Sequence, residues 1–137
     1  MTESQAKTTR GFARALGLFL ILFGLTIAVR ASVMWALLPA FFQDGALVFV
    51  TGAFGLTIGC AMVAAHHHFN SLAAIIITLF GWVTVIRSAI LLVAPQLVSQ
   101  VASMAMQIPG LPLIPAAVAV LIGVYLSFVG WFSKPAG

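Results

Sequence analysis

Charged residues are nearly absent from this chain of 137 residues: Asp, Glu, Lys and Arg together make up 6% of it. Soluble domains carry roughly 25% charged residues, so this composition excludes a soluble nucleotide-binding or DNA-binding domain. Hydrophobic residues instead make up 63% of the chain, and the mean hydropathy is +1.21. Such a composition is typical of an integral membrane protein, and we expect no nucleic acid partner.

Acids and reactive side chains are scarcer still. Asp44 is the only acid after the polar segment 1–14, so no helix carries the central carboxylate that proton relays and cation-coupled exporters need. The single cysteine, Cys60, excludes an intramolecular disulfide. We find no Ser/His/Asp set and no Gly-rich phosphate loop. The sequence therefore predicts no catalytic residue, no cofactor and no enzyme activity.

Four long apolar segments dominate what is present. Each can cross a hydrocarbon core about 30 Å thick, which takes about 20 residues. We expect helices at about 15–38, 46–65, 71–93 and 113–132. Polar residues recur every three to four positions after Pro95, which predicts an interfacial amphipathic helix at about 96–108. The expected fold is an all-α membrane protein with a cytoplasmic tail at 1–14 and one four-helix transmembrane domain at 15–137.

Basic residues flank the first and last apolar segments. Lys7, Arg10 and Arg14 precede the first, and Lys134 follows the last. Cytoplasmic loops and tails carry an excess of Lys and Arg. Both termini are therefore expected in the cytoplasm, with the 30–45 and 94–113 connections on the outside.

Two segments share a motif. The first apolar segment contains LFGLTIAVR at 22–30, and the third contains LFGWVTVIR at 79–87. This similarity indicates two tandem helical hairpins related by a pseudo-twofold axis along the membrane normal. Chance similarity between Leu-, Gly- and Ala-rich helices is the alternative.

Small residues recur at steps of three, four and seven along each apolar segment, which places them on one face of a helix. Transmembrane helices associate by close packing at such faces. The expected architecture is a compact, left-handed four-helix bundle. We assign helix packing to Gly24, Gly52, Gly55, Gly59, Gly81, Gly123 and Gly130.

Three histidines, His66, His67 and His68, follow the second apolar segment. Neutral imidazole is the commonest metal ligand and a common axial ligand of haem. Adjacent helical residues point about 100° apart, so the three cannot close on one metal while they are helical. Metal or haem binding by this cluster is an alternative to a plain interfacial turn.

Two arginines fall inside apolar sequence. Arg30 and Arg87 lie about 22 Å and 24 Å along their expected helices, at matching depths below the outer edge of the membrane. Asp44, Thr84 and Ser88 are candidate partners for them, and an arginine left unpaired could hold a lipid phosphate or an anionic solute. The alternative is that both arginines extend to the interface as anchors.

The segment HHHFNSLAAIIITLFGWVTVIRSAILLVAP resembles an uncharacterised family of small four-helix bacterial integral membrane proteins. That family has a His-Asn-x-Trp element, then Gly-Trp, a basic residue and a proline. Gly81-Trp82, Arg87 and Pro95 match this pattern, whereas the segment His68-Phe69-Asn70 lacks the tryptophan. The resemblance implies four helices and the bacterial inner membrane, and it implies no activity.

Taken together, these features favour a non-catalytic membrane protein that acts by interaction, as an accessory subunit, a lipid-binding scaffold or a homo-oligomer. Membrane lipid and either a protein partner or a second copy of the chain are the expected partners. A small transporter or channel for an anion or small solute, using Arg30 and Arg87, is the first alternative. A haem- or metal-binding component using His66, His67 and His68 is the second.

Overall fold

The computed structural model describes residues 2–132, and the chain is helical through almost all of this range. Lys134, used above to orient the chain, lies outside the described residues. Four of the helices are long and apolar enough to cross a membrane, which confirms an all-helical chain with four such segments. The six helices are α1 (Glu3–Val29), α2 (Ala31–Gln43), α3 (Gly45–Ala65), α4 (Leu72–Val93), α5 (Pro95–Met106) and α6 (Leu113–Phe132).

The first helix differs from its expected bounds at both ends. It begins at Glu3, within the expected tail, because Thr2 and Gln5 form a capping box. It ends at Val29, because the next residue, Arg30, has a φ of −109° and a ψ of 22° that leave the helical region. The expected helix 15–38 is therefore divided between α1 and α2. No proline or glycine marks this break, and hydropathy alone therefore could not place it.

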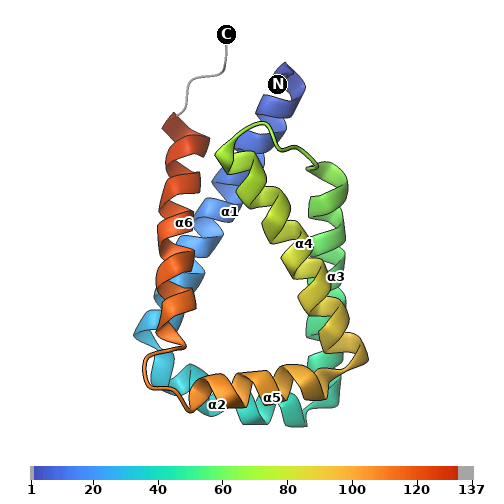
Figure 1. Cartoon of the computed structure of the whole chain (residues 1–137), viewed down its shortest axis with the longest axis vertical. Helices are drawn as coiled ribbons and strands as arrows, with labels where there is room; N and C mark the ends of the chain where they lie inside the picture. The colour runs from blue at the N-terminus through green and yellow to red at the C-terminus, as the bar shows by residue number, and fades with distance from the viewer. Residues whose placement is uncertain (1, 133–137) are drawn as a thin grey trace.

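The four long helices form two pairs, and the two short helices α2 and α5 join these pairs (Figure 1). Helix α1 packs along α6, and α3 packs along α4. The pairs meet at the end of the molecule that contains the 66–71 loop, and they diverge toward the other end (Figure 1). We call the end with this loop the histidine end. At the other end α2 and α5 contact each other and run between the pairs. A compact four-helix bundle is therefore not confirmed, since the two pairs pack closely at one end only.

The assigned glycines lie where the paired helices touch. A Cβ atom added to Gly123 would lie 2.8 Å from the carbonyl oxygen of Gly17 and 2.9 Å from the backbone nitrogen of Ile21. A Cβ atom added to Gly59 would likewise lie 2.9 Å from the backbone nitrogen of Val85. Real Cβ atoms almost never approach so closely, so the backbones of the paired helices can meet here only because glycine has no side chain. The other assigned glycines face α6 (Gly24), α1 (Gly130), α4 (Gly52, Gly55) and α3 (Gly81).

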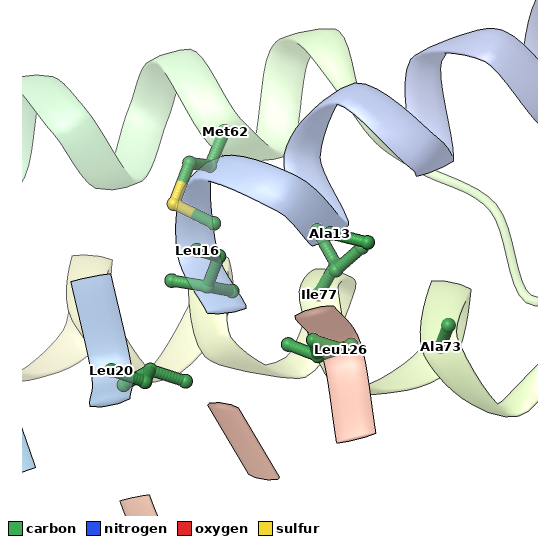
Figure 2. Packing of buried hydrophobic residues seen from close by; sticks show 7 residues of the cluster. All are labelled: Ala13, Leu16, Leu20, Met62, Ala73, Ile77 and Leu126. Carbon is green, nitrogen blue, oxygen red and sulfur yellow. The ribbon is translucent and has the colours of Figure 1, made fainter. Parts of the chain in front are cut away.

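The buried core lies at the histidine end and draws on all four long helices. Figure 2 shows Ala13 and Leu16 of α1 near Ile77 of α4 and Leu126 of α6. Ile77 and Leu126 are fully buried. The two helix pairs are thus held together at this end by apolar packing.

The two Leu-Phe-Gly motifs do not occupy equivalent positions. Gly24 lies against Ala116 and Val120, in the first turns of α6, whereas Gly81 lies against Met62 and Val63, in the last turn of α3. Gly24 is therefore near the α2 and α5 end, and Gly81 is near the histidine end. Any internal repeat must follow a different alignment from the one that the motif indicates.

Candidate functional site

An apolar cavity of about 530 Å³ lies between the two helix pairs, on the α6 side and next to α2 and α5. We call it the central cavity. Its lining comes from α1, α2, α4, α5 and α6, together with Pro112 of the connection into α6. Aromatic and aliphatic side chains predominate, among them Phe19, Phe23, Trp35 and Phe80. A cavity of this volume lies within the usual range of small-molecule sites, roughly 300–1,000 Å³.

Among the described residues, Arg87 is the one charged residue in this lining. It lies on α4 six residues before the helix ends at Val93, which is about 9 Å of helix rise. Among residues 2–132 its guanidinium group makes no ion pair, and the one pair found there joins Lys7 and Glu3 at 2.9 Å. An arginine inside a membrane-spanning helix is costly unless it reaches the interface or a partner. Its place in the lining makes Arg87 a candidate binding residue.

Thr84 is the only other assigned site residue in the central cavity, one turn of α4 before Arg87. Its hydroxyl donates a hydrogen bond of 2.7 Å to the carbonyl oxygen of Phe80. The oxygen can still accept a hydrogen bond from a ligand. The expected pairing of Thr84 with Arg87 is therefore not seen, although the two residues share one cavity wall.

The remaining assigned residues lie elsewhere. Arg30 stands at the junction of α1 and α2 and is not in the lining of the central cavity. Asp44 caps α3, where its carboxylate accepts a hydrogen bond of 3.0 Å from the backbone N–H of Leu47. Ser88 is buried in the α3–α4 interface against Gly55. The structure therefore does not bring the five expected site residues together in one cavity.

The histidines have different surroundings. His66 is fully buried, whereas His67 is exposed. The Thr78 hydroxyl donates to the carbonyl oxygen of His68 at 3.0 Å, so it can only accept from the Nδ1–H of His66 at 3.1 Å. Nε2 of His66 then accepts from the Thr9 hydroxyl at 2.9 Å. One neutral tautomer satisfies every group in this network.

Burial is the main cause that lowers the pKa of His66 below its ordinary value of 6.5, and the nearby His68 lowers it further. Both ring nitrogens of His66 are already engaged by hydroxyl groups. Within residues 2–132 no group of three or more His, Cys, Asp or Glu side chains could hold a metal ion. His66, which caps α3, thus links this helix to α1 and α4 through its hydrogen bonds to Thr9 and Thr78.

Four contacts at the histidine end were not expected from the sequence. Arg14 donates a hydrogen bond of 2.7 Å from Nε to the carbonyl oxygen of Gly130, and its guanidinium group lies 4.8 Å from the ring centroid of Trp131. Thr9 and Thr78 complete the His66 network. Thr9 falls in a segment that looked like a polar tail, and no sequence spacing connects it with a histidine that follows α3.

The fold defines the class of this protein: over residues 2–132 it is all-helical, with four helices of membrane-spanning length and an apolar cavity that contains an arginine. Comparison with protein-family models, curated proteins and solved structures finds no match.

Proposed function

We propose that this protein is a non-catalytic membrane protein that binds an anionic amphiphile, a lipid-like molecule with an acidic head group and a hydrocarbon chain, in the central cavity. The observation that carries the proposal is the single guanidinium group of Arg87 in an otherwise largely apolar lining. Arginine binds carboxylates and phosphates through a planar fork of N–H donors. The aromatic and aliphatic lining suits a hydrocarbon chain.

The mainly apolar lining around Arg87 favours an amphiphile over a freely hydrated anion as the ligand. A channel for small anions needs a polar path, whereas the central cavity offers Arg87 and Thr84 among predominantly apolar side chains. Arg30 does not line the same cavity, so a paired-arginine anion site gains no support from the geometry. The lipid-binding form of the interaction hypothesis is therefore the best supported. Membership of the small four-helix bacterial family remains a proposal.

The binding test compares Arg87→Gln with Arg87→Lys. We expect Arg87→Gln to weaken binding of a long-chain alkyl phosphate about tenfold or more, because a hydrogen bond to a charged group contributes about 1.5–3 kcal/mol. Arg87→Lys should lose less, since lysine keeps the charge without the fork. Protein in phosphatidylcholine nanodiscs would be titrated with the alkyl phosphate, and the bound fraction would be read by native mass spectrometry.

Arg30→Gln is the matched control, because Arg30 is an exposed arginine outside the central cavity. It should bind the alkyl phosphate as the unmodified protein does. An alkyl alcohol of the same chain length should bind equally weakly to Arg87→Gln and to the unmodified protein. Equal alkyl phosphate affinities of Arg87→Gln and the unmodified protein would refute the proposed function.

We also propose that the chain is an internal duplication with a pseudo-twofold axis, in an alignment of 64 residues. Each half has a long helix, a short helix and a second long helix in that order. Gly17 and Ile21 contact Gly123 as Gly81 and Val85 contact Gly59, and each residue has its counterpart 64 positions away. Helices α2 and α5 begin 64 positions apart as well. Arg87 then corresponds to Phe23, so one half contributes a cation and the other an aromatic ring at equivalent positions in the cavity lining.

We propose that the protein lies in the bacterial inner membrane and that its histidine end faces the cytoplasm. Lys7, Arg10 and Arg14 lie at this end of α1, and such residues mark cytoplasmic segments. A reporter active only in the periplasm should be silent when fused after Gly137 and active when inserted at Gly110, in the connection between α5 and α6. The reverse pattern would place α2 and α5 in the cytoplasm instead.

A further inference from the structure

A second cavity of about 310 Å³ lies between α2 and α5, and we call it the seam recess. Three of its lining side chains, those of Leu38, Ala102 and Met106, also line the central cavity. The two cavities are therefore neighbours, and we call these three apolar side chains their shared wall.

The two sides of this wall differ in polarity. The seam recess includes Gln43, Ser99 and Ser103, and the last two belong to the polar side of α5. The central cavity behind the wall is lined mainly by apolar groups, with Arg87 as its single charge. A path through the seam thus passes from polar side chains, across a thin apolar layer, to a cation that attracts an acidic head group.

Helices α2 and α5, which carry the wall, can separate with little loss of packing energy. Neither α2 nor α5 has a fully buried residue, so separating these two helices disrupts little packing. Met106 is the last residue of α5, and an unbranched methionine side chain adapts its shape readily. The core at the histidine end would not be disturbed, since none of its buried residues comes from α2 or α5.

We infer that the seam between α2 and α5 is the passage by which a single-chain anionic amphiphile enters and leaves the central cavity from the aqueous side. This inference rests on the proposed function. The single chain follows from the volumes, because cavities of about 310 and 530 Å³ match small-molecule sites rather than a two-chain phospholipid. Arg87 provides the attraction that draws the acidic head group inward.

A passage and a binding site respond differently to an obstruction. A bulky residue in a passage slows association and dissociation by the same factor and leaves the equilibrium constant unchanged, whereas a bulky residue in the site changes the affinity. Ser103 suits the test because it is exposed and lines the seam recess without lining the central cavity. Ser99→Trp offers a second obstruction from the same helix.

The experiment measures binding kinetics of a fluorescent alkyl phosphate by stopped flow, with the full chain in phosphatidylcholine nanodiscs. We expect Ser103→Trp and Ser99→Trp to slow both rates at least tenfold with Kd unchanged. Gln96→Trp is the matched control, since Gln96 is exposed on α5 and does not line the seam recess, and its rates should be those of the unmodified protein.

Unchanged rates in both tryptophan variants would overturn the passage and would indicate entry from the surrounding bilayer. A weaker Kd in these variants would also overturn it, since the seam recess would then be part of the binding site. Neither result affects the proposed function, which fails only if Arg87→Gln binds the alkyl phosphate with unchanged affinity.

Discussion

A Gly123→Leu substitution is expected to destabilise the protein by about 1–3 kcal/mol or more, the usual cost of overpacking an interior. The first added carbon would already lie 2.8 Å from the carbonyl oxygen of Gly17 and 2.9 Å from the backbone nitrogen of Ile21. These neighbours are backbone atoms that cannot rotate aside. Helices α1 and α6 must therefore separate, and the interface that they form along their length is lost.

The thermal unfolding midpoint in detergent, followed by circular dichroism, measures this effect. Gly11→Leu is the matched control, because a Cβ atom at Gly11 of α1 meets nothing within 4 Å. That variant should match or slightly exceed the stability of the unmodified protein, since leucine favours a helix more than glycine does. A Gly123→Leu midpoint equal to that of Gly11→Leu would contradict the α1–α6 interface.

A His66→Leu substitution is expected to lower the free energy of unfolding by about 1–3 kcal/mol, because it orphans buried hydrogen-bonding groups. Leucine fills much of the same volume, but it can neither accept from Thr9 nor donate to Thr78. The connection between α1 and α4 at the histidine end is then lost. His67→Leu is the matched control, and its exposed position predicts no more than a small change.

The same histidine gives the stability a defined pH dependence. Burial lowers the pKa of folded His66, whereas in the unfolded chain the pKa is near 6.5. Below about pH 6.5 the unfolded chain therefore binds more protons, and the free energy of unfolding falls as the pH falls toward the folded pKa. Denaturation midpoints measured across this range should show the loss in the unmodified protein. A His66→Leu variant with the same slope would show that other groups cause it.

The helical class and the four membrane-length segments could be predicted because they depend on hydropathy and length, which are local properties of the sequence. The small-residue faces could also be recognised, since helical spacing alone places Gly17, Gly24, Gly123 and Gly130 on shared faces. Which helix each face contacts is a long-range property. Spacing gave no means to choose α6 over α3 as the partner of α1.

The candidate site could be predicted only in part. An arginine in an apolar helix is a visible signal, and Arg87 does line the central cavity. The expected match between Arg30 and Arg87 assumed two unbroken helices, whereas α1 ends at Val29 and Arg30 lies in a break that no proline or glycine marks. That break creates α2, and α2 with α5 borders the central cavity. The cavity is therefore a product of tertiary structure that no single segment encodes.

The pairing of α1 with α6 has a consequence for synthesis. The ribosome makes the N-terminal segment first, and all of residues 30–112 must follow before α6 is made. During that interval α6 is not yet available to the glycine face of α1, whereas α3 and α4 follow each other in the chain and are joined by the short 66–71 loop. Helix α3 can therefore contact α4 soon after both are made, whereas the contact of α1 with α6 must wait until α6 has been made.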